Sequence, residues 1–223
     1  RCVQVAFCLF WGVFLLSAFL AYSKHVWPQY AEAVLTSGAI EDLETNFQNP
    51  VDGRDPEAGL MMAGFYIQHN TGIGLKCFAG GLAVIPGVVV TTFNAAFLGA
   101  AFGYMARPDV AQGQNFFHFV TAHGPFELTA IVLSAGAGLR LGLAWLLPGR
   151  WSRRSSLRKT AVETMPLMGA AMAMFFLAAL IEGFVSPSGL PYWIKATIAV
   201  LSSGLLSFYF IILGTPRRSS RAV

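Results

Sequence analysis

The stretch HGPFELTAIVLSAGAGLRLG, residues 123–142, decides the class of this fold. It is long and apolar enough to cross a bilayer as one helix. It nevertheless carries His123, Glu127 and Arg140. His123 and Glu127 are one helical turn apart and share a face. Because an ionisable group at membrane depth costs about 2.5–3.5 kcal/mol on insertion, we expect this face to line a polar site inside a membrane bundle.

The composition is that of a membrane protein. Of the 223 residues, 55% are hydrophobic and only 12% are charged, whereas soluble domains usually carry about 25% charged residues. The formal net charge is +4, with basic clusters at 150–159 and 217–221 and an acidic stretch from Glu32 to Glu57. No basic stripe is interleaved with aromatic residues, which argues against nucleic acid. The sequence predicts an all-α, polytopic transmembrane helical bundle in contact with the lipid bilayer.

About six membrane spans are expected, since about 20 apolar residues suffice for one crossing. Single spans are predicted at 3–22, 126–147, 160–184 and 191–213. The region 59–104 is too long for one span and too apolar for a loop. Its glycines and Pro86 predict a pair of short or broken spans with a tight turn near 80–87, or a re-entrant hairpin covered by protein.

The charges of the loops predict the orientation of the bundle. The basic loop at 148–160 is expected in the cytoplasm, because positive residues favour that side. The acidic loop at 23–57 is then non-cytoplasmic, either as a solvated connector or as a surface for a partner. Both ends of the sequence are expected in the cytoplasm, and the whole chain forms a single transmembrane domain. A further segment is expected before Arg1, because the chain enters its first apolar run without a methionine.

Polar residues from four of the expected spans fall at similar depths in the outer half of the bundle. Such a cluster can be hydrogen-bonded glue between helices, a proton or cation site, or a catalytic metal centre with His123, Glu127 and Glu182 as ligands. No HExxH motif is present, and a His–Glu pair one turn apart is a weak signal for zinc. The predicted intramembrane cluster consists of Asn70, Asn94, His123, Glu127 and Glu182.

Two further ionisable residues have secondary roles. His69 could join the cluster beside Asn70, but an interfacial position is the simpler interpretation. Arg140 lies about 20 Å beyond Glu127 along one helix, so it is expected to snorkel toward the cytoplasmic face or to meet a carbonyl end of the broken second span.

Small residues predict close helix packing. Two GxxxG motifs are present, and such motifs allow helices to approach closely in lipid. They are expected to serve packing within the chain, with a homodimer interface as the alternative. The glycines concerned are Gly99, Gly103, Gly138 and Gly142.

Five motifs follow one another over about residues 60–187. They are FYIQHNTGIGLKCFAGG (65–81), TTFNAAFLGAAFG (91–103), HGPFELTAIVLSAGAGLRLG (123–142), PGR (148–150) and IEGFVSP (181–187). Together they resemble the stage II sporulation protein M family. This chain differs in having His69-Asn70 where the family often has paired Asn, and Asn94-Ala95 where it often has Asn-Gly.

The resemblance implies a multi-pass protein of the bacterial cytoplasmic membrane. The namesake resembles a scaffold that holds cell-wall hydrolases at the septal membrane, and relatives in bacteria that never sporulate often accompany MoxR-type ATPases. No enzyme activity, catalytic residue or cofactor comes with the resemblance. We therefore expect a non-enzymatic scaffold in envelope or peptidoglycan remodelling, whose partners are other membrane or envelope proteins. The alternatives are a proton- or cation-coupled transporter component and a membrane-embedded metal hydrolase with Glu127 as general base.

Overall fold

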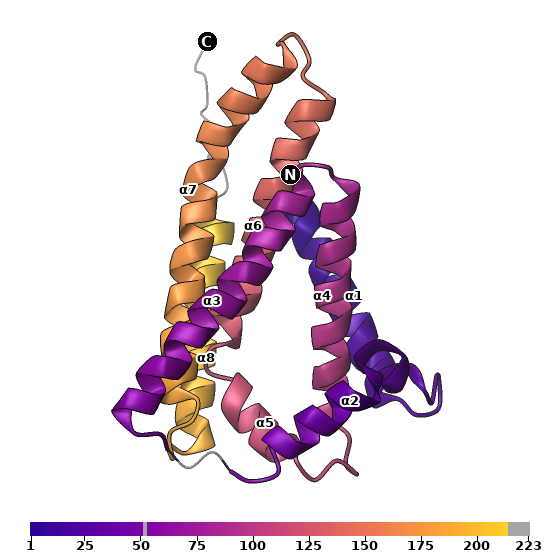
Figure 1. The fold of residues 1–223 in the computed structure, drawn as a ribbon, viewed down its shortest axis with the longest axis vertical. Coiled ribbons are helices and arrows are strands. Elements are labelled where there is room, and N and C mark those ends of the chain that lie inside the picture. Colours follow the sequence, from indigo (N-terminus) through magenta and orange to yellow (C-terminus); the bar gives the residue numbers. More distant parts are fainter. Residues whose placement is uncertain (51–52, 214–223) are drawn as a thin grey trace.

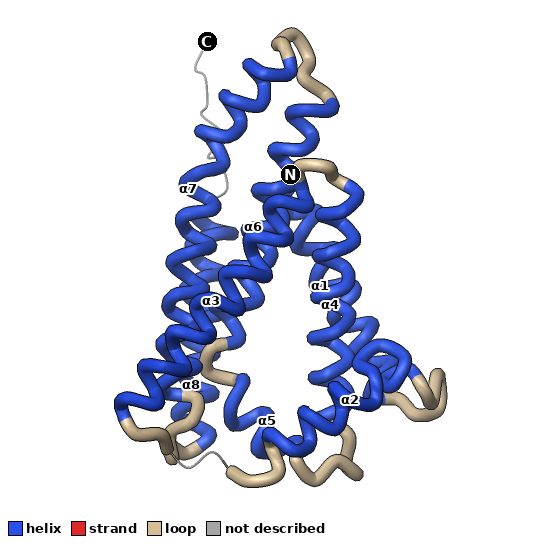
Figure 2. Tube along the Cα trace, viewed as in Figure 1, coloured by secondary structure: helices blue, strands red, loops and turns tan. Residues whose placement is uncertain are grey.

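The computed structural model describes residues 1–50 and 53–213, and these residues form helices and loops without a strand (Figures 1 and 2). This confirms the predicted all-α class. The shorter elements are α2 (Tyr30–Asn46), α5 (Gly113–Val120) and two wide helical turns, η1 (Ile181–Val185) and η2 (Phe208–Leu213). The long helices are α1 (Cys2–Tyr22), α3 (Pro56–Gly81), α4 (Ile85–Met105), α6 (Gly124–Leu146), α7 (Arg153–Leu180) and α8 (Tyr192–Ser207).

The long helices run alternately between two ends of the molecule. One end, called here the α5 end, carries α2, α5 and the loop 186–191 (Figure 1). The opposite end, called the α6–α7 end, carries the turn 82–84, the loop 147–152 and the start of α1. The pair α1–α4 and the group α3–α6–α7 approach each other toward the α6–α7 end and diverge toward the α5 end.

Helix α6 is the centre of the bundle. Every residue from Ala130 to Leu139 is buried. In the most apolar 18-residue stretch of α6, 67% of the residues are buried, compared with 11% in the corresponding stretch that begins in α8. A helix that is apolar and buried on all sides needs neighbours all round. Helix α6 contacts α1, α3, α4, α7 and α8. Side chains in the middle of α6 therefore face the interior of the protein.

Five helices of the described chain are long and apolar enough to cross a membrane, namely α1, α4, α6, α7 with η1, and α8 with η2. Helix α3 has 26 residues, enough to span about 39 Å, and it packs along α4, α6 and α7. With Gln68, His69, Asn70 and Lys76 in its middle and second half, it lacks an apolar stretch comparable to those of the other long helices. It is the sixth long helix of the bundle, and the polar site lies against it.

The two helices in the region 59–104 are each continuous, which corrects the expectation of broken spans. Helices α3 and α4 form a hairpin whose turn at 82–84 lies where a tight turn was predicted. Pro86 lies in the first turn of α4, where its missing N–H costs no hydrogen bond. Two glycines of α3 are contact points: an added Cβ on Gly74 would lie 2.3 Å from Phe175, and one on Gly81 would lie 2.4 Å from Gly138.

Candidate polar site between α3, α6 and η1

The site begins at the first turn of α6. His123 precedes the helix, Pro125 occupies its first turn, and Glu127 follows one turn later. The Nε2 atom of His123 lies 3.7 Å from a carboxylate oxygen of Glu127, and the two side chains are 5% and 15% exposed. The shared face predicted from the sequence spacing is therefore present, and it is directed into the protein.

A wide helical turn brings in the second carboxylate. At the end of α7 the hydrogen bonding changes, and the N–H of Ser186 donates to the carbonyl of Ile181 at 2.8 Å. This hydrogen bond joins residues five positions apart, as in a π-helix. Such wide turns are often found at functional sites. Within it Glu182 is buried, with 8% of its surface exposed. The turn places Glu182 and Ser186 on the side that faces α3 and α6.

Two hydrogen bonds hold the ionisable side chains in place. Asn70 of α3 donates from Nδ2 to a carboxylate oxygen of Glu182 at 3.2 Å. Ser186 Oγ lies 2.9 Å from Nδ1 of His123. Asn70 and Ser186 are buried as well, at 3% and 2% exposure. Each bond joins separate elements, so the polar site links α3 to η1 and η1 to the start of α6.

His123, Glu127 and Glu182 converge closely. One ligand atom from each of the three lies within 4.8 Å of the other two. A nitrogen and two carboxylate oxygens in this arrangement could coordinate a metal ion, hold a shared proton, or bind the helices together through polar contacts.

The structure does not bring Asn94 into this site. The Asn94 side chain is half-buried and donates to the carbonyl of Val90 on its own helix at 2.9 Å. No hydrogen bond joins it to the other four cluster residues in the described chain. Helix α4 packs mainly against α1, so an equal depth in the membrane does not give Asn94 the same neighbours. Four of the five predicted residues therefore meet, and Asn94 lies outside.

The two secondary residues have other partners. His69 is exposed on α3 and stacks on Phe65, with ring centroids 5.7 Å apart, so it points away from the cluster although Asn70 follows it directly. Arg140 donates to the carboxylate of Glu163 on α7. Arg140 does not meet a carbonyl end of a broken helix, because α3 is continuous.

Both GxxxG motifs lie at helix crossings within the chain. A Cβ added to Gly99 or Gly103 would lie 2.3 Å or 2.1 Å from a backbone oxygen of α1. A Cβ added to Gly138 or Gly142 would lie 2.4 Å or 2.1 Å from a backbone oxygen of α3. These four glycines are thus occupied by contacts inside the molecule, and any contact between two copies of the chain would have to use other residues.

Sequence reasoning missed Ser186 and Lys195. Lys195 is only 1% exposed, and its Nζ donates to the carbonyls of Ser186 at 2.7 Å and Ser188 at 2.9 Å. It therefore fixes the backbone that follows η1. An ionisable residue in an apolar run was a visible signal for Lys195, whereas nothing in the letters SPSG announced Ser186.

Arg54 and Tyr66 are also near the site and were not predicted. The Arg54 guanidinium lies 5.9 Å from the ring centroid of Phe119. It is close enough to Tyr66 and Glu182 to interact electrostatically with both. Arg54, a basic residue of the acidic loop, therefore lies near the carboxylate of Glu182.

A hollow of about 360 Å³ opens beside the site at the α5 end. His118, Phe119, Ser186 and Lys195 are among the residues that line it. Burial, together with the positive charge of Lys195, lowers the pKa of His118 below its ordinary value. Ser186 also contacts His123, so this hollow is separated from the polar site by that one side-chain contact.

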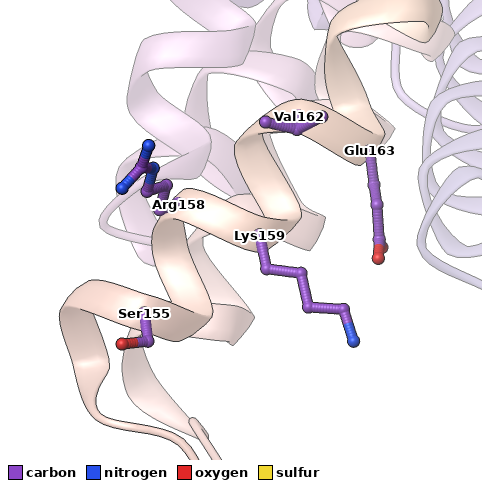
Figure 3. A pocket seen from close by; sticks show the side chains of 5 residues that line it. All are labelled: Ser155, Arg158, Lys159, Val162 and Glu163. Carbon is purple, nitrogen blue, oxygen red and sulfur yellow. The ribbon is translucent and has the colours of Figure 1, made fainter.

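A second hollow lies on the exposed start of α7, lined by Ser155, Arg158, Lys159, Val162 and Glu163 (Figure 3). Arg158 and Lys159 extend from the helix in different directions. A small-molecule site would need converging polar groups, and these side chains do not converge. The hollow lies more than about 30 Å along α7 from Glu182, so it is separate from the polar site.

A sequence profile described as stage II sporulation protein M matches residues 5–187. The match is longer than the motifs used in the sequence analysis and includes α1 and α2. No significant match was found among curated proteins, and none among solved structures. The long apolar helices agree with a membrane protein of this kind. Since the profile covers more than half of the chain, the protein belongs to the stage II sporulation protein M family.

Proposed function

We propose that this protein is a non-enzymatic scaffold of the bacterial cytoplasmic membrane, which holds other envelope proteins together during remodelling of the cell envelope. The observation that carries the proposal is the form of the acidic segment between α1 and α3. A mere connector would need no fixed shape, whereas a docking surface requires one.

Helix α2 is anchored to the bundle by apolar residues. It has two arms that meet at Thr36, whose φ of 67° breaks the helical path. Ala31 and Leu35 of the first arm are buried, and they pack with Ala21 of α1 and with Ala100 and Ala101 of α4. The first arm therefore rests on the α1–α4 pair.

Polar contacts fix the ends of the same segment. Lys24 forms an ion pair with Asp109 at 2.5 Å, and the Tyr104 hydroxyl donates to Glu44. Asn115 of α5 donates to the carbonyl of Phe47 at 2.9 Å. The acidic segment is thus connected to α4, α5 and the loop between them.

The anchored helix presents acidic side chains outward. Glu32, Glu41 and Asp42 are exposed and have no ion-pair partner among the described residues. Complementary charge favours the encounter and the orientation of a partner. The surface formed by these three residues, called here the acidic α2 surface, suits a basic segment of an envelope protein on the non-cytoplasmic side.

The test is crosslinking in native membranes from a photoreactive residue at Thr45, which is exposed on α2. The triple variant Glu32→Gln, Glu41→Gln and Asp42→Asn should lose the crosslinked envelope proteins. The matched control is Glu57→Gln, an exposed acidic residue outside α2, which should retain them. The same partners recovered at the same yield from the triple variant would contradict the scaffold proposal.

A second candidate function, a proton- or cation-coupled transport component, is supported by the convergence of His123, Glu127 and Glu182 inside the bundle. Ionisable residues buried in membrane proteins often form ion pathways. In reconstituted vesicles, Glu127→Gln should abolish a pH-dependent flux while the protein stays folded. Glu163→Gln, at an exposed glutamate outside the site, should leave the flux intact. A flux that survives Glu127→Gln would exclude this candidate.

A further inference from the structure

We propose that His123, Glu127 and Glu182 form a binding site for one divalent transition-metal ion of the zinc class. The ligands are Nε2 of His123 and one carboxylate oxygen from each glutamate. They come from the start of α6 and from η1, which are separated by the whole of α7. This inference is independent of the scaffold proposal, since a metal here can hold helices together whatever the protein binds outside.

The distance between His123 and Glu127 favours a shared ion over a direct bond. Their nearest atoms are 3.7 Å apart, beyond the 2.7–3.2 Å of an N–H···O hydrogen bond. Two ligands on one tetrahedral zinc ion, each at about 2.0–2.1 Å, lie about 3.3 Å apart. A small adjustment of either side chain reaches that value. The third ligand atom, from Glu182, lies within 4.8 Å of both. Two ligands of one zinc ion lie at most about 4.2 Å apart, so Glu182 would join the same ion after an adjustment of its side chain.

The residues around the ligands have the arrangement that metal sites use. Ser186 Oγ at 2.9 Å from His123 Nδ1 can accept that N–H, and this tautomer leaves the Nε2 lone pair free for a metal. Asn70 donates to one oxygen of Glu182 at 3.2 Å and fixes the direction of that carboxylate. Ligating histidines and carboxylates usually have such outer hydrogen bonds. Here both bonds come from residues that are themselves buried.

The charges around Glu127 and Glu182 also favour a divalent metal ion. Two buried carboxylates that face each other are stable as charged groups only with a compensating cation, and otherwise take up protons. Arg54 acts electrostatically on Glu182, while Lys195 is engaged by the carbonyls of Ser186 and Ser188. Of the described basic side chains, only His123 lies within 4.0 Å of Glu127. A divalent ion between the three ligands would neutralise both carboxylates while the imidazole remains neutral, as a metal ligand must be.

The ion would also have a role in the fold. Ser186, whose Oγ contacts His123, lines the hollow of about 360 Å³ at the α5 end. Once bound, the ion would join α6 to η1 directly, and α3 indirectly through Asn70. These elements diverge from the α1–α4 pair at this end of the molecule (Figure 1), so the metal would hold the wider end of the α3–α6–α7 group together.

The test uses the whole protein, purified without a histidine tag, stripped with a chelator and then titrated with Zn²⁺ or Co²⁺. We expect one metal ion per chain by elemental analysis, and visible absorption typical of low-coordinate Co²⁺. His123→Ala and Glu182→Gln should lower the affinity at least tenfold. The matched controls His69→Ala and Glu163→Gln remove the same residue types outside the site and should bind as the wild type does.

A gentler variant keeps the test decisive if a ligand substitution unfolds the protein. Ser186→Ala retains all three ligands and removes only the bond to Nδ1 of His123, so it should weaken Zn²⁺ binding about 10- to 100-fold. Wild-type protein that binds neither ion at micromolar concentrations would overturn the proposal and leave a proton-sharing cluster. Binding that is equal in wild type and folded Ser186→Ala, or that is lost equally in the controls, would also overturn it.

Discussion

A Cβ atom placed on Gly138 would lie 2.4 Å from the carbonyl oxygen of Phe78, so α6 and α3 are in backbone contact at this point. In lipid, close packing of this kind replaces the hydrophobic drive that associates helices in water. The contact also sets how near Asn70 on α3 lies to the elements that carry Glu182 and His123. The glycine therefore supports both the fold and the geometry of the polar site.

The first prediction concerns Gly138. Gly138→Ala should destabilise the protein by about 1–3 kcal/mol, because the added methyl group forces two backbones apart. The control is Gly169→Ala on α7, where nothing lies within 4 Å of the added carbon, so its helix propensity should leave stability unchanged or slightly raised. Unfolding of both variants in detergent measures the difference. Equal stability of the two would show that the α3–α6 contact is looser than described.

The second prediction concerns the bond between Asn70 and Glu182. Asn70→Leu should cost about 1–3 kcal/mol, because it leaves a buried carboxylate without its donor. The double variant Asn70→Leu with Glu182→Leu should cost less than the sum of the single variants, since it removes both members of the pair. Unfolding free energies in the presence of a chelator separate this bond from any metal. Simple additivity would mean that the two side chains do not interact.

The fold was largely predictable because apolar length and loop charge determine where helices begin and end. The tight turn near 80–87 followed from glycine and proline content, and the structure has it at 82–84. Continuity of α3 could not be predicted, because a glycine that breaks a helix and a glycine that touches a neighbour have the same letter. The packing partners show that these glycines are contact points: Gly74 lies against Phe175, and Gly81 lies against Gly138.

The site was predictable only in part. The two signals were helical spacing and the depth of each residue in the membrane. The one-turn spacing placed His123 and Glu127 on one face, and equal depth brought Glu182 and Asn70 to them. Depth does not say which helices pack together, and α4 packs mainly against α1, so Asn94 does not join the other four residues. The wide turn η1 also has no sequence signature, and it is this turn that presents Ser186 to His123.

The third prediction concerns pH and His118, which lies outside the membrane-spanning helices. Its pKa is lowered from 6.5, first by burial and then by the charge of Lys195. Below pH 6.5 the unfolded state therefore binds more protons than the folded state, and stability falls as the pH drops through this range. His118→Gln should flatten that dependence.

The contribution of Lys195 can be measured in the same experiment. Lys195→Met removes the charge, and the pKa of His118 in that variant should rise toward its ordinary value. A titration of the His118 ring by NMR in nanodiscs reads the pKa directly. An unchanged His118 pKa would mean that Lys195 has no electrostatic effect on the hollow at the α5 end.

The last prediction concerns orientation and the status of α3 as a span. If α3 crosses the membrane, the turn 82–84 and the loop 147–152 lie on the cytoplasmic side, and α2 lies on the other. Cysteines are introduced singly at the exposed positions Thr45, Ala83 and Ser155, after Cys2, Cys8 and Cys77 are replaced. A membrane-impermeant maleimide added to intact cells, after the outer membrane is opened where one is present, should label Thr45→Cys and spare the other two until the membrane is permeabilised.

The Ala83→Cys variant is the decisive one. Helix α3 is the only long helix between Thr45 and Ala83, so these two residues lie on opposite sides of the membrane only if α3 crosses it. The basic residues at 150–159 favour a cytoplasmic Ser155, and the turn 82–84 lies at the same end of the molecule as the loop before Ser155. If α3 remained on the outer surface, Ala83 would be labelled in intact cells together with Thr45. Asn70 would then lie at the interface, and the carboxylate of Glu182 would face water rather than a buried partner. Labelling of Ala83→Cys before permeabilisation would therefore contradict the six-span arrangement and the intramembrane site together.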